Sequence, residues 1–441
     1  MLWKKNILIL ISLISFGLSC NPAEKPENTV NAPVKDSHDP RPVTMEREVL
    51  YDKILGLLVG SAIGDAMGAP TEMWNRYDMQ VEYGHIIDLD SMVREPSAEG
   101  IWDYNLPAGS TTDDTRWKAL MVDYFTGKGE KPSKRKARLY ARDFARLIVE
   151  NYEGELDKLK KLDHFELDPY EAQMRKAAWL KEWAMVGKPF VEDDIQGYAD
   201  GVNKFYGGEM VCAGMLFCPV VGAVYPGDPE WAYQQTYEID IFDHGYAKDI
   251  SGLTAAMVSA AMVENPAIDS VLGVNRSVDP REYFKSRLVG RTAFRVFRDA
   301  RYIVHEARKV DVKEVMKDPP VQLALPLKTH EDSVKYAQMS TAYQMLDQKL
   351  ERYPFHPSEI HIINLTALMF SNFDFELSME FVTNYGRDND TVAAVTGSIL
   401  GAYWGAGKLP HKMVNQVIDA NLKLGFDFEE MARRMTDSLL G

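Results

Sequence analysis

The stretch Tyr-Gly-Arg-Asp-Asn-Asp-Thr at residues 385–391 is a glycine-led acidic loop that runs directly into an apolar helix, expected from Thr391 to about Trp404. It places two carboxylates, Asp388 and Asp390, around the start of that helix. The N-terminus of a helix carries partial positive charge and is stabilised by acidic side chains. Taken alone, the stretch is therefore explained by a capped helix, with either Asp388 or Asp390 as the N-cap.

A second acidic, hydroxyl-rich turn lies far upstream and changes this interpretation. Residues 110–115 have the sequence Ser-Thr-Thr-Asp-Asp-Thr, and a helix is expected from Arg116 to about Phe125. Two such turns brought together would surround a site with carboxylate and hydroxyl oxygens, which are the ligands of a hard divalent cation such as Mg2+ or Mn2+. The sequence therefore predicts that the two turns meet at a metal site.

Regularly spaced glycines indicate how the turns would meet. The first folded helix is expected from Met45 to about Met67, and the glycines in and just after it recur every four residues, as they do after residue 391. The two sets are Gly56, Gly60, Gly64 and Gly68, and Gly397, Gly401 and Gly405. A glycine inside a helix costs about 1 kcal/mol relative to alanine, so a series of them indicates close approach of another backbone. We expect the two glycine faces to touch, which would carry Asp65 and Glu72 towards the acidic loop.

Composition limits the classes of function. The chain of 441 residues has a formal net charge of −15 and a pI near 5.2, which argue against nucleic-acid binding because that requires a basic surface. It has three cysteines and no Cys-x-x-Cys motif, so we do not expect a zinc site. Cys212 and Cys218 are expected to be buried small side chains, or a bridge in an oxidising compartment. The apolar residues 54–63 are too few to span a membrane.

The N-terminus has the parts of a secretory signal. Two lysines precede an apolar run, residues 7–18, that is too short for a transmembrane span and is followed by Ser19 and Cys20. A cysteine at this break resembles the lipobox of bacterial lipoproteins. We expect residues 1–20 to be a lipoprotein-type signal peptide. Cys20 would then anchor an extracytoplasmic protein to a membrane, on the periplasmic side or at the cell surface.

The rest of the chain is expected to contain one folded domain. A proline-rich polar segment, residues 21–43, is predicted to be a disordered tether. Residues 44–441 show helical periodicity with almost no strand-like alternation, so we predict a single all-α domain. Within it, residues 75–109 lack a clear period and are expected to form a long loop. The glycine-rich residues 207–215 could cradle a phosphate, but they contain no Lys or Arg, and helix packing is the favoured interpretation.

Together these motifs resemble the ADP-ribosylglycohydrolase family, which includes the dinitrogenase-reductase-activating glycohydrolases. Residues 64–72, Gly-Asp-Ala-Met-Gly-Ala-Pro-Thr-Glu, match the family block GDAxGxxxE. Residues 112–115 match its TDDT block, and residues 386–391 resemble its GGDTDT block. The blocks occur in the family's order, and the resemblance extends over about residues 46–441.

This resemblance implies an all-α orthogonal multi-helix bundle that holds two divalent cations, Mg2+ or Mn2+. The implied metal ligands are Thr112, Asp113, Asp114, Asp388, Asp390 and Thr391. Glu72 falls on the family glutamate that is tied to catalysis or to gating of the site. Asp390 is implied as the bridging ligand and as a second catalytic residue. The implied substrate-binding residues are His244, Arg387 and Asn389.

The implied reaction is hydrolysis of a ribosyl N- or O-glycosidic bond, first of all an ADP-ribosyl bond, by a metal-activated water. Arg387 stands where the family has a glycine, and it would either grip an anionic group of the substrate or pair with Asp388. Leu216 stands where the family has an arginine beside the diphosphate. The alternatives are therefore a diphosphate-free substrate, such as a nucleoside or furanoside glycan, or a non-catalytic ligand-binding protein. We expect a monomer with a small-molecule or glycan-type ribosyl substrate, no nucleic-acid partner, and membrane contact only through the lipid anchor.

Overall fold

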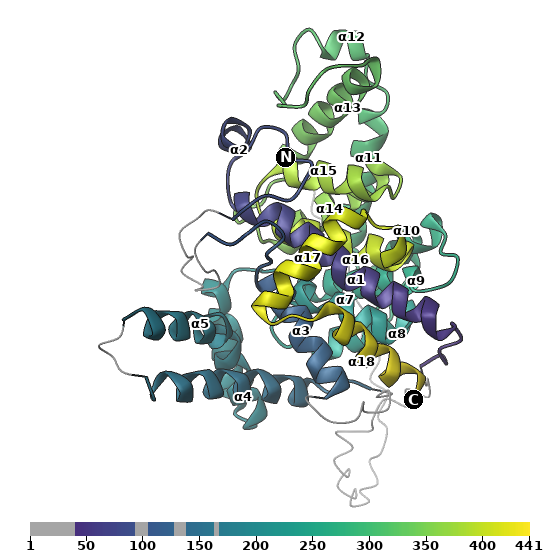
Figure 1. Ribbon diagram of the computed structural model, residues 1–441. Coiled ribbons are helices and arrows are strands. Elements are labelled where there is room, and N and C mark those ends of the chain that lie inside the picture. The colour runs from purple at the N-terminus through teal and green to yellow at the C-terminus, as the bar shows by residue number, and fades with distance from the viewer. Residues whose placement is uncertain (1–39, 93–104, 128–137, 163–166) are drawn as a thin grey trace, which may run out of the picture. The chain divides into compact units, whose positions relative to one another are not determined.

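The computed structural model describes residues 40–92, 105–127, 138–162 and 167–441 (Figure 1). These residues form eighteen α-helices and four short 3-10 turns, and no β-strand occurs among them. The prediction of an all-α fold is confirmed. The predicted signal peptide and most of the predicted tether lie outside the described residues.

The helices are numbered in chain order as in Figure 1, and the 3-10 turns are η1 to η4. The α-helices are α1 Arg47–Gly68, α2 Arg76–Glu82, α3 Asp113–Thr126, α4 Ala141–Leu159, α5 Leu167–Val191, α6 Ile195–Lys204, α7 Ala213–Val224, α8 Pro229–Ile239, α9 Ala247–Ala261, α10 Ile268–Ser277, α11 Thr292–Ala307, α12 Val312–Val315, α13 His330–Asp347, α14 Pro357–Ser371, α15 Phe375–Tyr385, α16 Asn389–Trp404, α17 His411–Leu424 and α18 Phe428–Leu440. The 3-10 turns are η1 Ala69–Thr71, η2 Phe205–Gly208, η3 Tyr283–Lys285 and η4 Ala406–Lys408.

Helices α1 and α16 form the most extensive contact between any two described helices. Their glycines meet backbone to backbone: a Cβ placed on Gly401 would lie 1.9 Å from the carbonyl oxygen of Gly56, and one on Gly397 would lie 2.0 Å from that of Gly60. No side chain fits at such distances, so the predicted contact between the two glycine faces is confirmed. Gly405 is the exception, because it ends α16 with a φ of +81° instead of continuing the face.

Helices α3, α7, α9, α14, α15, α17 and α18 pack against this central pair. The segment Arg47–Thr71 has the length and composition of a membrane span, but 94% of its apolar window is buried inside the fold. A helix that is apolar all round is typical of the centre of a large protein as well as of a membrane. The expectation that this region is too short to span a membrane was wrong about its length, and its burial accounts for its apolar sequence.

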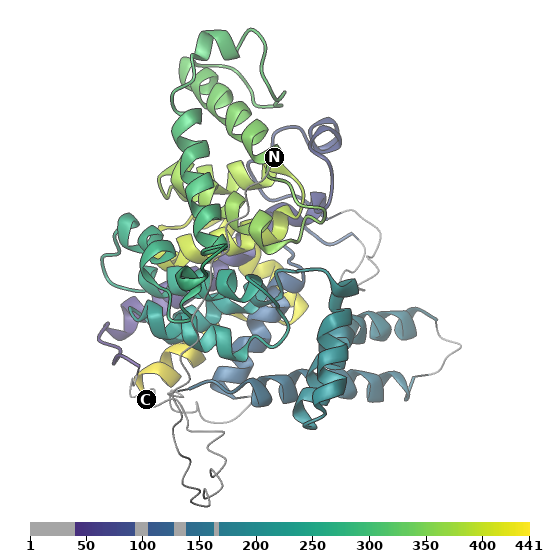
Figure 2. The same cartoon turned by 180° about the vertical axis from the view of Figure 1, so that it is seen from behind.

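Helices α4 and α5 form a pair that reaches away from the central helices in both views (Figures 1 and 2). Aromatic rings join this pair to the bundle. Trp183 of α5 stacks on Trp117 of α3 with 3.7 Å between ring centroids, and Phe144 of α4 lies 5.1 Å from Phe217 of α7. Such pairs of large rings contribute strongly to packing energy. The tryptophan pair anchors α3, the helix that follows the second acidic turn.

Several boundaries differ from the expected ones. Helix α2 lies inside the predicted long loop, where the side chain of Asn75 caps its first turn; residues 93–104 of that loop lie outside the described residues. Helix α3 begins at Asp113 instead of Arg116, which puts both acidic residues of the second turn inside the first helical turn. Helix α16 begins at Asn389, so Asp388 occupies its N-cap position.

The folded part begins a few residues before residue 44. The backbone N–H of Arg41 donates to Oδ2 of Asp228 at 3.0 Å, and Val43 packs against the hydrophobic core. Residues 40–43, which were assigned to the tether, therefore belong to the folded body.

Replacing Gly397 by alanine is expected to lower the free energy of unfolding by roughly 3 kcal/mol, because the added methyl group would force α1 and α16 apart. Gly273→Ala in α10 is the matched control, since nothing lies within 4 Å of its Cβ position. Removing that helical glycine should leave stability unchanged or raise it by up to about 1 kcal/mol. Urea unfolding of both variants measures the difference, and equal effects would contradict the backbone contact.

Candidate metal centre

The close approach of α1 and α16 brings the first and third motifs together. A Cβ on Gly68 would lie 2.3 Å from backbone atoms of Asp390, so the end of α1 lies directly against the first turn of α16. Side-chain oxygens of Glu72, Asp388 and Asp390 lie within 4.8 Å of one another. Both aspartates are buried, whereas Glu72 is partly exposed. Three carboxylates at this spacing could hold a metal ion.

Asp65 connects α1 to the second acidic turn. Its fully buried carboxylate accepts hydrogen bonds from the backbone N–H of Thr112 at 2.9 Å and from that of Thr115 at 3.1 Å. The hydroxyl of Thr115 donates to the same carboxylate at 2.7 Å. Asp65 therefore satisfies N–H groups at the start of α3, as an N-cap side chain does, although it belongs to another helix. It positions the second acidic turn.

Two hydroxyl groups join the second and third motifs directly. Thr112 donates to Oδ2 of Asp390 at 3.4 Å, and Thr391 donates to Oδ2 of Asp114 at 3.0 Å. Burial raises the pKa of Asp113, and the carboxylates of Asp114 and Glu72 lie close enough to raise it further. The structure thus gathers Glu72 and all six implied ligand residues, Thr112, Asp113, Asp114, Asp388, Asp390 and Thr391.

Burial and like charges raise pKa values within the acidic cluster, which consists of Asp65, Glu72, Asp113, Asp114, Asp388 and Asp390. Burial, and then the charge of Asp114, raises the pKa of Asp65 to about 7. Burial, and then Glu72, raises the pKa of Asp388 to about 8 and that of Asp390 well above its ordinary value. Burial of like charges disfavours the ionised forms, and a bound cation would reverse that effect.

The residues present fit hard divalent cations. Six carboxylates, those of Asp65, Glu72, Asp113, Asp114, Asp388 and Asp390, interact with one another electrostatically. With the ammonium group of Lys118, which contacts Asp114, and the guanidinium of Arg116, whose charge acts on Asp113, their formal charge is −4 when all are ionised. Two divalent cations would reduce it to zero. Oδ1 of Asp390 is buried and has no hydrogen-bond partner among the described residues. Such an oxygen, in an all-oxygen donor set, suits Mg2+ or Mn2+.

The Glu72 segment and the Asp388 loop are hydrogen-bonded to each other through their backbones. The N–H of Met73 donates to the carbonyl of Arg387 at 2.7 Å, and the N–H of Arg387 donates to the carbonyl of Trp74 at 3.4 Å. Met73 and Arg387 both have positive φ, +64° and +69°, a conformation that is uncommon outside glycine. The two acidic segments are thereby held in fixed register.

The guanidinium of Arg387 is occupied by Glu359. It donates to both carboxylate oxygens of Glu359, at 2.7 and 2.9 Å, and to the carbonyl of Glu351 at 3.0 Å. Glu359 is 1% exposed in the first turn of α14. Of the two roles expected for Arg387, the pairing role is observed, but its partner is Glu359 and not Asp388.

Asn389 is fully buried and donates through Nδ2 to the hydroxyl of Thr71 at 2.9 Å and to the carbonyl of Thr383 at 3.1 Å. These bonds connect the start of α16 to η1, just before Glu72. In this structure the amide therefore joins two segments of the site. Its predicted contact with substrate stays a prediction.

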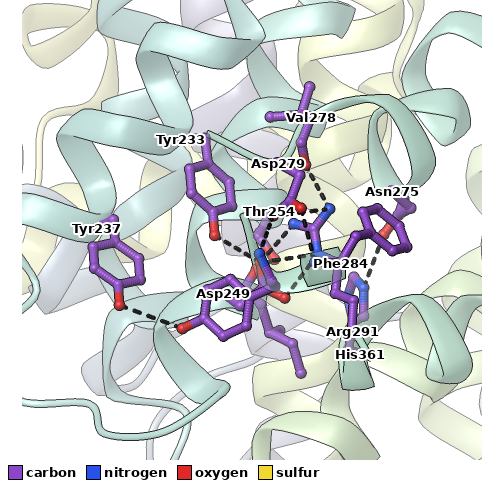
Figure 3. A network of polar contacts seen from close by, with 12 residues as sticks. Tyr233, Tyr237, Asp249, Thr254, Asn275, Val278, Asp279, Phe284, Arg291 and His361 are labelled. Carbon is purple, nitrogen blue, oxygen red and sulfur yellow. Dashed lines mark hydrogen bonds and ion pairs between the residues drawn. The ribbon is translucent and has the colours of Figure 1, made fainter. Parts of the chain in front are cut away.

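His244 lies in the turn between α8 and α9 and is partly exposed. Close to this turn is a buried ion pair (Figure 3): Arg291 donates through Nε and Nη2 to Asp249 at 2.9 and 2.5 Å, and the hydroxyl of Tyr233 donates to Asp249 at 2.7 Å. The hydroxyl of Tyr283 donates to the carbonyl of Gly245 at 3.3 Å. Of these contacts, the bond from Tyr283 reaches the turn that carries His244, and the substrate role of His244 stays a prediction.

The glycine-rich residues 207–215 lead into α7, and at Gly214 they serve helix packing: a Cβ there would lie 2.5 Å from a serine hydroxyl of α9. Burial, and then the charge of Asp388, raises the pKa of the Cys212 thiol. Cys212 therefore lies near the acidic cluster. Cys212 and Cys218 are both free buried thiols, so the alternative of a bridge between them is wrong in this structure.

Sequence reasoning missed two residues of the site. Lys118 contacts Asp114 from one turn further along α3, and Glu359 holds Arg387. The i, i+4 spacing of Asp114 and Lys118 was a usable signal for the first pair. The second pair joins different helices and carries no local signal.

The fold and this cluster define an all-α protein with an oxygen-rich group of carboxylates that could hold a metal ion. The chain belongs to the ADP-ribosylglycohydrolase family, whose model matches residues 46–440. Among solved structures it is similar to an "ADP-ribosylglycohydrolase-related protein complex", with 15% sequence identity and a TM-score of 0.49, over 89% of this chain and 99% of that chain. No curated protein matches the chain. Membership of this family indicates a glycosidic hydrolase, and the family generally depends on divalent metals.

Arg387→Gly is expected to destabilise the protein by roughly 3 kcal/mol, because Glu359 would be left as a buried, unpaired carboxylate. Glycine accepts the positive φ, so this variant isolates the loss of the ion pair from backbone strain. The double variant Arg387→Gly/Glu359→Gln should recover most of the loss. Urea unfolding of the single and double variants measures this coupling; additive losses would show that the pair contributes nothing.

Proposed function

We propose that this chain is a divalent-metal-dependent hydrolase that cleaves a ribosyl N- or O-glycosidic bond, with an ADP-ribosyl compound as the first candidate substrate. The observation that carries the proposal is the convergence of Glu72, Asp388 and Asp390 within 4.8 Å, in a chain of this family. The two hydroxyl bridges between the acidic turns support it, because they orient the carboxylates before any ligand binds.

The proposed ligands are Thr112, Asp113, Asp114, Asp388, Asp390 and Thr391, with Glu72 close enough to Asp388 and Asp390 to share in the binding. Divalent cations held there would orient the ribose hydroxyls and lower the pKa of the attacking water. Asp390 lies between the two turns, with one oxygen bonded to Thr112 and the other unpartnered among the described residues. This position suits the bridging role proposed for it.

Glu72 is the proposed proton acceptor. Of the three carboxylates that lie within 4.8 Å of one another, Glu72 is partly exposed whereas Asp388 and Asp390 are buried, so it can meet water and substrate from the solvent side. In hydrolysis, the water oxygen bonds to C1 of the ribose as the bond to the leaving group breaks. One proton of the water would pass to the Glu72 carboxylate and the other would stay on the new C1 hydroxyl; Glu72 would then give up its proton to the leaving group, directly or through water. The backbone bonds of Met73 and Trp74 hold the segment that follows Glu72 in place.

A diphosphate-free substrate is the second candidate. The guanidinium of Arg387 is taken by Glu359, and Leu216 is 8% exposed in α7, so neither position offers a cation to a diphosphate. A nucleoside or a furanoside glycan would need only the ribose-binding part of the site. We also propose that the protein acts as a monomer on a small-molecule or glycan-type substrate and does not use nucleic acid.

Binding of ADP-ribose to the full chain is expected to require the metal. Calorimetric titration with Mg2+ should show saturable binding, and titration in EDTA should show none. Asp390→Asn should reduce ADP-ribose affinity in Mg2+ at least about a hundredfold, the scale of loss when a metal site is damaged. Asp419→Asn, at an exposed position of α17, is the matched control and should bind normally.

The outcomes of this titration separate the candidates. If the protein takes up metal but does not bind ADP-ribose, the diphosphate-free substrate becomes the first candidate. Normal metal binding by the Asp390→Asn protein would contradict the assignment of the metal centre.

We propose in addition that Cys20 carries a lipid anchor and places the domain outside the cytoplasm. Cys20→Ser should move the protein from the detergent phase to the aqueous phase in a Triton X-114 partition. Ser19→Ala, which keeps the cysteine, should leave it in the detergent phase. Aqueous partitioning of the unaltered chain would contradict the anchor.

A further inference from the structure

Lys118 is a buried lysine in direct contact with the acidic cluster. Its side chain is 2% exposed, and Nζ donates to the carbonyl of Asp114 at 3.0 Å and to Oδ1 of the same residue at 3.3 Å. Burying an ammonium group costs a large amount of free energy unless a charge partner is present. Among the described residues, Asp114 is the acid that its ammonium group contacts, and its charge also acts on Asp65.

Asp114 is the residue through which this ammonium acts on the site. Oδ1 faces Lys118, while Oδ2 accepts from Thr391 at the start of α16. The carboxylate is therefore held from both sides, by its own helix and by the opposite acidic turn. One positive charge of the protein lies in contact with a carboxylate that is a proposed metal ligand.

We propose that Lys118 is an internal counter-ion: it holds Asp114 in place in the metal-free protein and weakens the binding of the cation that Asp114 would ligate. The inference rests on the metal site of the proposed function. An ammonium and a metal cation that share one carboxylate repel each other, and this repulsion is strong where water is excluded. Lys118 would thus preserve the geometry of the empty site at the expense of metal affinity.

The chain contains a matched control. Lys53 of α1 is also buried, at 4% exposure, but its Nζ donates to three backbone carbonyls, those of Ala261, Ala402 and Tyr403. Two of these belong to the C-terminal turn of α16, whereas the acidic cluster lies at the N-terminus of that helix. Lys53 therefore has the same burial and side chain as Lys118 without its contact to a proposed metal ligand.

Thermal unfolding of the full chain in EDTA and in saturating Mn2+ tests the inference. Lys118→Met should lower Tm in EDTA by roughly 5 °C, since a buried carboxylate loses its partner. In Mn2+ most of this loss should disappear, so the rise in Tm on adding metal becomes larger than in the unaltered protein. Calorimetry should show Mn2+ binding about tenfold tighter at the affected site. Lys53→Met should lower Tm equally in both buffers.

This test separates failure of the internal counter-ion from failure of the metal site itself. If the unaltered protein shows no metal-induced rise in Tm, the proposed function fails. If that rise is present but is unchanged or smaller in Lys118→Met, the internal counter-ion is refuted while the metal site stands.

A second variant covers the case in which Lys118→Met folds poorly. Asp114→Asn/Lys118→Met removes both charges and should regain at least half of the Tm lost in EDTA. A double variant as unstable as the single one would also refute the inference, because packing would then explain the lysine.

Discussion

The backbone contact between α1 and α16 is the constraint on which the rest of the structure depends. Because glycines remove the side chains that would separate the two helices, the residues that follow α1 and those that open α16 have little freedom relative to each other. Thr71 and Asn389, which are 318 residues apart in the chain, are thereby brought into hydrogen-bonding distance. This contact brings the end of α1 against Asp390, and the hydrogen bonds of Asp65 then add the carboxylates of α3 to the acidic cluster.

Gathering carboxylates in a buried place opposes folding, and the surrounding structure offsets part of that cost. Asp65 receives two backbone N–H groups and a hydroxyl from the start of α3. Asp114 receives a hydroxyl and an ammonium group. Burial and neighbouring carboxylates raise the pKa values of Asp113, Asp388 and Asp390, and this crowding of like charges is the physical reason to expect a cation there.

The part of the site that could be predicted from sequence is the part encoded by spacing. Glycines every four residues predicted a helix contact, and two acidic turns before helices predicted a meeting of carboxylates. The partner of Arg387 could not be predicted, because Glu359 comes from α14 and the pairing depends on how three helices pack. The same holds for Asp65, whose hydrogen bonds reach the backbone of another helix. Side-chain partners across helices are set by tertiary packing, which a local pattern does not contain.

The paired backbones of Met73, Trp74 and Arg387 have a mechanical consequence. Arg387 is tied in turn to Glu359, so the segment after Glu72 is linked through the Asp388 loop to α14. A swing of Glu72 away from the aspartates by backbone motion would have to break this linkage or drag the neighbouring loop with it. The backbone that carries Glu72 is thus coupled to α14, so a shift of α14 would be transmitted to the acidic cluster.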